Sequence, residues 1–219
     1  MLFAISCNIK RYHNSPGDFL YNDYIQFFEE KGINILPVSN ACKNIELYFN
    51  RFKVEGFILS GGNDLGSEPV RDSQEELLLN LAIERMLPVF GICRGMQFIN
   101  YYFGGGLPID IVTTDINIEN HVVSSHEIKV VDSKWKNLIG KDRVNTNSFH
   151  RQGLIMDQIS KELEVLAISV SSGLVEALCH KEYPIVGIQW HPERKSPDNQ
   201  VNDIILKSLK DRTCYWSAK

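Results

Sequence analysis

The chain has 219 residues, of which 43% are hydrophobic and 23% charged, a composition that supports a compact domain with a sizeable core. Two domains would each be small for this apolar content, so we expect one domain spanning residues 1–219. The formal net charge is −4, and acidic and basic residues are interspersed. This pattern argues against nucleic-acid and anionic-membrane binding and favours a small soluble partner, with a homodimer left open.

Five scattered cysteines indicate a reducing compartment. They form an odd set with no CxxC and no Cys/His pairs at zinc-site spacing, so we expect free thiols and a cytoplasmic location. The apolar start at residues 1–6 is too short for a signal segment and is followed at once by polar and basic residues. No other apolar run approaches the roughly 20 residues that span a bilayer.

Short apolar runs alternate with stretches of helical period in the first half of the chain, the pattern of βαβ units in a parallel sheet. The expected strands are residues 2–6, 33–38, 56–59 and 87–92. The expected helices are residues 18–31, 43–52, 73–86, which opens on a Ser-x-x-Glu capping box, and 94–103.

The second half predicts a more antiparallel arrangement. Strands are expected at residues 127–131, 163–169, 174–179 and 185–189, and Ser196-Pro197 precedes a closing helix that runs to about residue 209. The sequence therefore predicts an α/β fold with a central, mostly parallel sheet, flanking helices and a smaller antiparallel element.

The pentapeptide Gly91-Ile92-Cys93-Arg94-Gly95 places a nucleophile between small residues, a pattern that permits a sharp strand-to-helix turn. Because Cys93 would lie at a helix N-terminus, the helix dipole and free backbone N–H groups favour its thiolate. Taken alone, the pentapeptide is equally consistent with a buried cysteine whose neighbouring glycines serve packing.

A second motif, Gly187-Ile188-Gln189-Trp190-His191-Pro192-Glu193, places a histidine at the end of an expected strand. Glu193 can turn back to accept the imidazole N–H of His191. With Cys93, these residues supply the nucleophile, base and orienting acid that acyl transfer through cysteine requires. A lone histidine such as His191 is more often a surface residue or a core residue whose hydrogen bonds are satisfied. The occurrence of both motifs at the ends of expected strands is unlikely to be a coincidence.

The third motif is Ser60-Gly61-Gly62, directly after the strand expected at residues 56–59. Glycine lets the backbone approach a substrate and present N–H groups to a developing oxyanion. We expect the backbone N–H groups of Gly62 and Arg94 to form this oxyanion hole. An ordinary loop is the alternative interpretation of the glycine pair.

In this order and at these separations, the three motifs resemble the class I glutamine amidotransferase superfamily, and the resemblance spans nearly the full chain. Arg71-Asp72, Arg94 and the run Asn-Ser-Phe-His-Arg-Gln at residues 147–152 resemble its γ-glutamyl hydrolase branch, peptidase family C26, which includes γ-glutamyl-γ-aminobutyrate hydrolases. The resemblance implies a flavodoxin-like fold. It also implies a free-standing hydrolase, since a chain of this length has no room for a synthase domain.

Further site residues follow only from the resemblance. It implies that the glutamyl group is held by Gly61, Gln97, Asn147, Ser148, Phe149 and His150, although the last three also fit a turn with a half-buried aromatic. Glu176 either faces the site or is a solvent-facing strand glutamate. His121 and His126 resemble a histidine pair of this branch, for which we expect a structural role.

The implied reaction begins when the Cys93 thiolate attacks the γ-carbonyl of a glutamyl conjugate. His191 then protonates the departing amine and activates the water that hydrolyses the γ-glutamyl thioester. No metal or organic cofactor is required.

The motifs do not encode the leaving group. Cationic residues that neighbour them are Arg94, Arg151, Arg194 and Lys195, with Lys10-Arg11 after the first strand. Such cations suit an anionic, phosphate-bearing leaving group, as in the γ-glutamyl-CDP-amidate hydrolases of capsule synthesis, but they equally fit a solvated surface. Two other functions stay open: a glutaminase subunit that supplies ammonia to a separate synthase, and a non-catalytic binding member of the fold.

Overall fold

The computed structural model describes residues 1–112 and 124–217, which are organised around a nine-stranded sheet. Its strands are β1 (Leu2–Ser6), β4 (Asn34–Val38), β5 (Gly56–Leu59), β6 (Val89–Ile92), β8 (Ser124–Val130), β9 (Arg143–Ser148), β11 (Leu163–Ser169), β12 (Val175–His180) and β13 (Ile185–Ile188).

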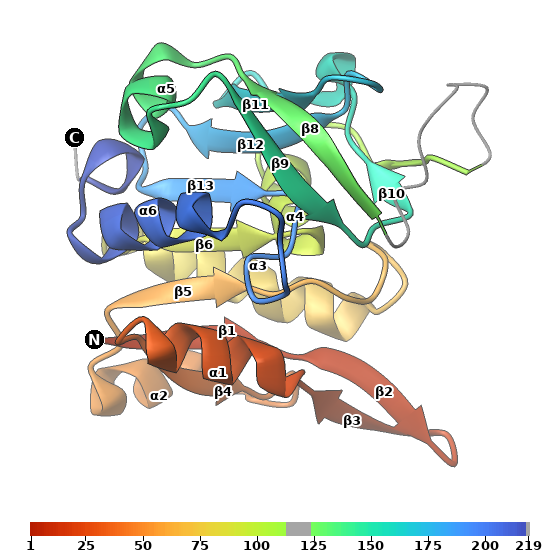
Figure 1. The fold of residues 1–219 in the computed structure, drawn as a ribbon. Coiled ribbons are helices and arrows are strands. Elements are labelled where there is room, and N and C mark those ends of the chain that lie inside the picture. Colours follow the sequence, from red (N-terminus) through yellow and green to blue (C-terminus); the bar gives the residue numbers. More distant parts are fainter. Residues whose placement is uncertain (113–123, 218–219) are drawn as a thin grey trace.

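The strand order is β4-β1-β5-β6-β13-β12-β11-β8-β9 (Figure 1). The first five strands in this order pair in parallel, and the pairings from β13 onward are antiparallel. This arrangement confirms the mostly parallel sheet expected from the sequence. The antiparallel part extends the same sheet at one side.

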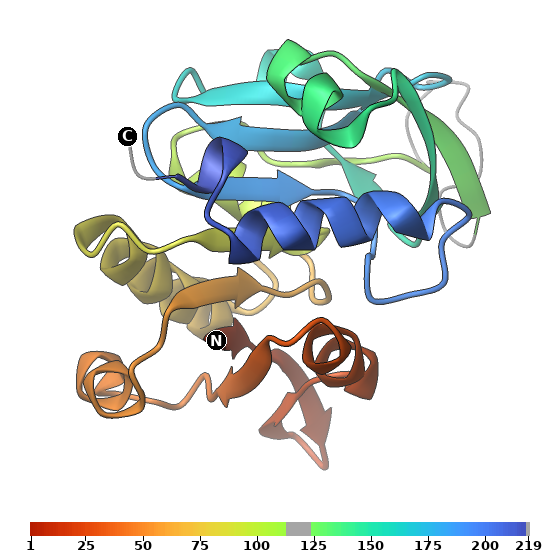
Figure 2. The same cartoon turned by 60° about the vertical axis from the view of Figure 1, so that its left-hand side comes forward.

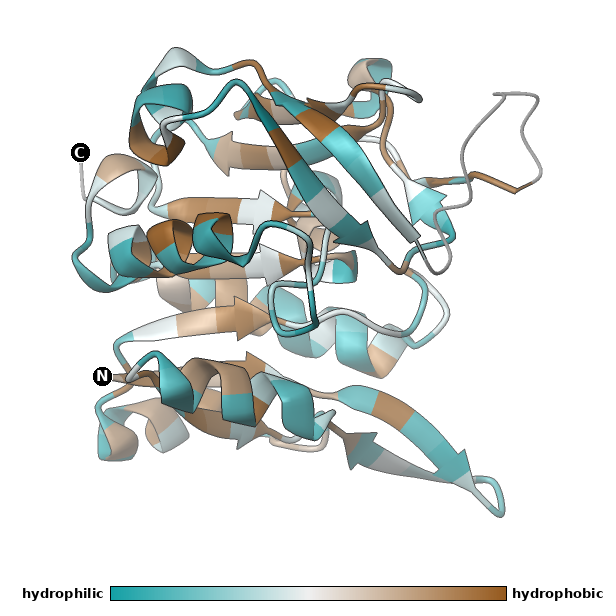
Figure 3. Ribbon diagram, viewed as in Figure 1, coloured by the Kyte–Doolittle hydropathy of each residue, from teal (hydrophilic) through white to brown (hydrophobic). Residues whose placement is uncertain are grey.

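Helices cover both faces of the sheet (Figure 2). One face carries α1 (Asn22–Glu30), α5 (Ser133–Ile139) and α6 (Asn199–Lys210), and the other carries α2 (Ile45–Phe52), α3 (Pro69–Glu84) and α4 (Arg94–Tyr102). Each face has its own apolar cluster: Phe28, Trp135 and Ile205 pack in the first, and Phe49 and Met96 pack in the second. Hydrophobic residues accordingly concentrate on the central strands, while the helices turn polar residues outward (Figure 3).

Two segments differ from the sequence-based expectation near the N-terminus. Strands β2 (Asn8–Tyr12) and β3 (Ser15–Phe19) form a hairpin through His13 and Asn14, which both have positive φ, as a two-residue hairpin turn requires. The helix expected from residue 18 therefore begins only at Asn22. The sequence does not predict this hairpin, because the residues of β3 are mostly polar, do not alternate with apolar residues and include Pro16.

Helix α3 begins at Pro69, four residues before the expected capping box at Ser73. Proline at the first helical position needs no N–H partner and presets φ, so it starts the helix without that box. Helix α5 and strand β9 were also not anticipated. The small elements are β7 (Ile109–Asp110) paired with β10 (Gln152–Gly153), and the 3-10 turns η1 (Met156–Gln158) and η2 (Cys214–Trp216).

All five cysteines are free thiols. Among residues 1–112 and 124–217, no helix combines the length and apolar character that crossing a bilayer demands.

The backbone is closely packed at the junction between β6 and α4. A Cβ atom at Gly95 would overlap the backbone carbonyl of Leu59, and one at Gly91 would collide with the carbonyl group of Gly95 and the Ile99 side chain. Only glycine lets the first turn of α4 lie directly against β5. This close approach fixes Cys93, which lies between the two glycines.

We predict that Gly95→Ala lowers the free energy of unfolding by about 1–3 kcal/mol, because the backbone at Leu59 must shift to admit the methyl group. Gly17→Ala is the matched control: its Cβ would meet nothing closer than the Lys10 carbonyl oxygen at 3.8 Å, and we expect a change within about 0.5 kcal/mol. Urea unfolding measures both. Equal stability of the two variants would show that the junction tolerates a side chain.

Candidate active site

The candidate site lies at the carboxyl ends of the central parallel strands, the edge at which ligands bind in open α/β folds. The register pairs Leu59 of β5 with Gly91 of β6, and Ile92 of β6 with Ile188 of β13. The segments that follow these three strands therefore leave the sheet next to one another. They carry the three motifs singled out in the sequence.

Cys93 lies between β6 and α4 with φ +54° and ψ −107°, in the left-handed half of backbone space. Its N–H donates to the Ile188 carbonyl oxygen at 2.8 Å, and its side chain is 8% exposed. The Gln189 side-chain amide lies 3.5 Å from the Cys93 Sγ. This is the sharp strand-to-helix turn predicted from the flanking glycines, and it holds the thiol at the base of a cavity.

His191 is 3% exposed, and its Nδ1 lies 2.6 Å from the Glu193 Oε1. Burial alone lowers the pKa of His191, but the charges of Glu193 and of the Cys93 thiolate outweigh it and raise the pKa to about 10. The imidazole thus interacts with the Glu193 carboxylate on one side and the Cys93 sulfur on the other. Such an arrangement favours the charged, imidazolium form of His191.

Asn147 holds the His191 segment in place. Its side-chain oxygen accepts from the His191 N–H at 2.9 Å, and its amide donates to the His191 carbonyl at 2.7 Å. The amide also reaches the Arg194 carbonyl at 3.3 Å. These bonds use the Asn147 side chain within the protein, where it supports the His191 segment, and Asn147 does not line the cavity described below.

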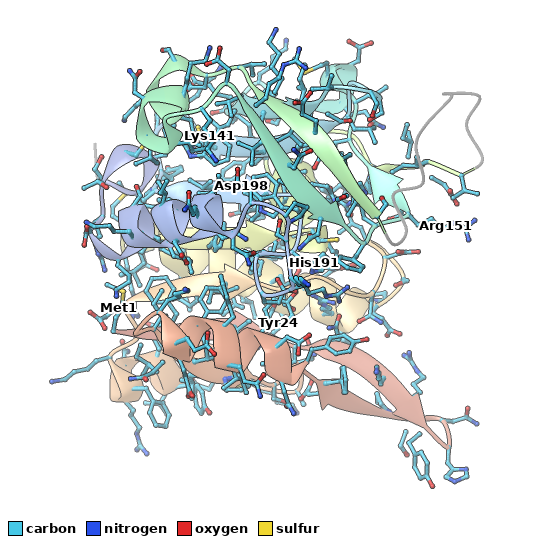
Figure 4. The ribbon with its side chains drawn as sticks, viewed as in Figure 1. Met1, Tyr24, Lys141, Arg151, His191 and Asp198 are labelled. Atoms are coloured by element: carbon cyan, nitrogen blue, oxygen red, sulfur yellow. The ribbon has the colours of Figure 1, made fainter. Side chains whose placement is uncertain are left out.

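The loop after β5 passes close to both side chains. A Cβ at Gly61 would lie 2.9 Å from the His191 Cε1 and 3.4 Å from the Cys93 Cβ. The Gly61 N–H donates to the Tyr24 hydroxyl at 3.0 Å, whereas the N–H groups of Gly62 and Arg94 have no acceptor among the described residues. These two N–H groups are therefore free to bind a ligand. Figure 4 labels Tyr24 and His191, which lie at this edge of the sheet.

A cavity of about 180 Å³ opens over the thiol. Of the residues predicted to bind substrate or oxyanion, it is lined by Gly61, Gly62, Arg94, Gln97, Phe149 and His150, together with Cys93 and His191. Ser148 is fully buried and, like Asn147, does not line it.

Tyr21 and Tyr24 also line the cavity, and sequence reasoning missed both. They lie at the start of α1, where the helical spacing of aromatic residues predicts a helix and gives no sign of a site. Gln189 belongs to the motif that ends in His191 and Glu193, and the sequence predicted no role for its side chain. Its Oε1 accepts from the Gln97 side chain at 3.2 Å, which joins the cavity wall to the thiol.

The side chain of Arg94 points into a buried ion-pair cluster. Its guanidinium is bound by Asp72 and Glu75, and it is 2% exposed. Arg151 pairs with Asp110 at 2.9 Å. Arg194 stays at the mouth, with its guanidinium 4.6 Å above the Phe149 ring and 5.8 Å from the Tyr21 ring. Lys10, Arg11 and Lys195 do not line the cavity, and the Arg94 charge is neutralised by its carboxylate partners. Of the expected cations, Arg194 and Arg151 thus remain to offer a charge at the cavity.

Glu176 is fully buried on β12, 3.0 Å from the Nε2 of His126, and does not line the cavity. Both alternatives given by the sequence, a solvent-facing glutamate and a residue facing the site, are therefore wrong for Glu176. His121, the other member of the expected histidine pair, lies outside the described residues. Within the described ranges, no three His, Cys, Asp or Glu side chains gather as a metal site would need.

Comparison with known proteins agrees with this architecture. Residues 2–193 match the family Peptidase C26. The γ-glutamyl-CDP-amidate hydrolase of Campylobacter jejuni is 30% identical over 183 residues, which cover 81% of this chain and 78% of that protein. The γ-glutamyl-γ-aminobutyrate hydrolase of Escherichia coli K12 is 30% identical over 161 residues, which cover 68% of this chain and 62% of that protein.

Among solved structures, the glutaminase domain of Trypanosoma brucei CTPS superposes with a TM-score of 0.71 over 100% of this chain and 97% of that domain. At 16% identity this likeness establishes the class I glutamine amidotransferase fold and nothing finer. The match over residues 2–193 decides the family. The chain belongs to the peptidase C26 family.

Proposed function

We propose that the chain is a free-standing cysteine hydrolase that cleaves the γ-glutamyl amide bond of a small conjugate and releases glutamate and the free amine. The observation that carries the proposal is the buried His191–Glu193 pair, 2.6 Å apart, beside Cys93 at a strained strand-to-helix turn. The two relatives named above are, by name, hydrolases of γ-glutamyl compounds. Five free thiols fit a reaction in the cytoplasm.

In the first step the Cys93 thiolate attacks the γ-carbonyl carbon, and the carbonyl electron pair moves onto oxygen. Collapse of this tetrahedral intermediate breaks the C–N bond, and the imidazolium of His191 gives its proton to the departing amine. Glu193 keeps the imidazole oriented and stabilises its charged form. The products of this step are the free amine and a γ-glutamyl thioester on Cys93.

In the second step neutral His191 takes a proton from water as the oxygen attacks the thioester carbonyl. The second tetrahedral intermediate expels the thiolate and leaves the γ-carboxyl group of glutamate. The N–H groups of Gly62 and Arg94 stabilise the oxyanion in both steps, since neither has another acceptor in the described structure. Gln97 and His150 bind the glutamyl group from the cavity wall.

The leaving group would emerge between Tyr21, Phe149 and Arg194. A guanidinium held over aromatic rings offers both a stacking surface and charge-assisted donors, a combination that suits an anionic, aromatic group such as a nucleoside phosphate. A γ-glutamyl-CDP-amidate would satisfy this chemistry and would release cytidine diphosphoramidate for capsule synthesis. The likeness to the Campylobacter jejuni hydrolase supports this substrate.

A glutaminase subunit is the second candidate, because the fold is shared with glutaminase domains. It would release ammonia from glutamine and depend on a synthase partner. A non-catalytic member of the fold is disfavoured, since Cys93, His191 and Glu193 are all present and in contact.

The substrate class is tested by glutamate release from a panel of glutamine, γ-glutamyl-γ-aminobutyrate, a γ-glutamyl peptide and a γ-glutamyl phosphoramidate nucleotide. We expect turnover of a conjugate with glutamine a poor substrate, and complete loss of turnover in Cys93→Ala, because no other group in the cavity can form the thioester. Turnover of glutamine alone, or only after a partner protein is added, would favour the glutaminase subunit.

The raised pKa of His191 predicts the alkaline limit of activity. The imidazolium that protonates the amine is present below a pKa of about 10 and is lost as the pH rises through it, so kcat/KM should fall above that pH. Glu193→Gln removes a charge that raises the pKa, and the alkaline limb should move down by about one to three pH units. An unchanged limb would contradict the assigned role of Glu193.

Arg194→Met tests the leaving-group region, because it removes the charge and keeps the aliphatic stem. The Arg194 Nε also lies 3.9 Å from the Glu193 Oε1, so a small change is expected for every substrate. We expect KM for the phosphoramidate nucleotide to rise by about tenfold or more, well beyond the change for glutamine. Arg143→Met is the control, since Arg143 pairs with Glu127 on strands β8 and β9 away from the cavity. A similar rise for all substrates would show that Arg194 does not recognise the leaving group.

A further inference from the structure

A buried network of charges connects the two segments that carry the free N–H groups. Arg71 of α3 is fully buried, and its Nη2 donates to the carbonyl oxygens of Ser60 at 2.8 Å and of Gly61 at 3.1 Å. Its Nε donates to Glu75 at 3.1 Å, and the other carboxylate oxygen of Glu75 accepts from Arg94. The proposed hydrolase chemistry leaves Arg71 and Glu75 without a role.

The contact with Gly61 constrains the orientation of a peptide group. A peptide bond is planar and trans, so the carbonyl of Gly61 and the N–H of Gly62 point in opposite directions. While Arg71 holds this carbonyl on the side of α3, the Gly62 N–H must face the other way. Gly62 lines the cavity with Cys93, and its N–H has no acceptor among the described residues.

We propose that Arg71, held in turn by Glu75, is a positioning residue that locks the Gly61–Gly62 peptide with its N–H toward the Cys93 thiol. The oxyanion hole is then formed before substrate arrives. Rotation of this peptide by half a turn would remove the Gly62 donor, bring a carbonyl oxygen toward the nucleophile and break the buried hydrogen bond between Arg71 and the Gly61 carbonyl.

Glu75 extends the lock to the second donor. It binds Arg71 through one oxygen and Arg94 through the other, and Arg94 is the residue whose backbone N–H completes the hole. Asp72 also binds Arg94, so two carboxylates balance two guanidinium groups. Buried charges paired in this way hold their geometry, because moving any one of them strands its partner without compensation. Both donors are thus fixed relative to one buried carboxylate.

The inference rests on the proposed hydrolase function and adds that activation by a partner is unnecessary. It is tested with Arg71→Lys, which keeps the charge but loses the planar fork, and with Glu75→Gln, which keeps the volume but loses the charge. Arg85→Lys is the matched control, because Arg85 pairs with Glu46 at the surface beyond the far end of α3.

Two rate constants separate positioning from a general structural effect. Single-turnover acylation by the conjugate that the unmodified protein hydrolyses requires the oxyanion hole, whereas alkylation of Cys93 by iodoacetamide requires only the thiolate. We expect Arg71→Lys and Glu75→Gln to slow acylation by about 10²- to 10³-fold, with alkylation and KM close to those of the unmodified protein. Arg85→Lys should change neither rate.

Acylation at the unmodified rate in both variants, with hydrolysis by the unmodified protein intact, would overturn the inference alone. Equal loss of acylation and alkylation would also overturn it, because that result means a loosened fold. If neither variant folds, the unmodified protein still provides the test: a lag before acylation, or acceleration by a partner, contradicts a preformed hole. Failure of the unmodified protein to hydrolyse any conjugate would instead contradict the proposed function.

Discussion

The strained backbone of Cys93 is the constraint on which the rest of the site depends. A non-glycine residue at φ +54° costs on the order of 1–3 kcal/mol and persists only where its surroundings enforce it. Here the Cys93 N–H is bound to β13, and Gly91 and Gly95 let the neighbouring backbone close in on either side. The thiol is therefore held at the edge of the sheet, where it faces a cavity and is not enclosed by the core.

The other parts of the site are assembled around that thiol by strands that end together. β13 delivers His191, whose backbone is held by Asn147, and β5 delivers the glycine loop, whose carbonyls are held by Arg71. Both supports are buried side chains bonded to backbone atoms, so the reacting groups are placed by elements that cannot move independently. A preorganised site of this kind needs little rearrangement on substrate binding, as the proposed free-standing hydrolase requires.

Sequence reasoning was most successful where one physical rule dominates. The strands at Leu2–Ser6, Gly56–Leu59 and Leu163–Ser169 were predicted to the residue because short, predominantly apolar runs mark buried strands. The hairpin at residues 8–19 escaped because it is exposed and polar. In the candidate site, motif spacing and glycines singled out Cys93, His191, Glu193 and the glycine loop, and the structure brings these segments to one edge of the sheet. The roles of Asn147 and Arg94 required coordinates, since nothing in a sequence shows which way a polar side chain turns.

The central claim is that Cys93 carries a γ-glutamyl thioester during turnover. The most direct measurement is an acid quench of the protein during steady-state hydrolysis of its best conjugate, followed by mass spectrometry of the proteolytic peptides. The account predicts the added mass of one γ-glutamyl group on the peptide that contains Cys93, lost on treatment with hydroxylamine. Steady hydrolysis with that peptide unmodified throughout, or with the group on another residue, would contradict it.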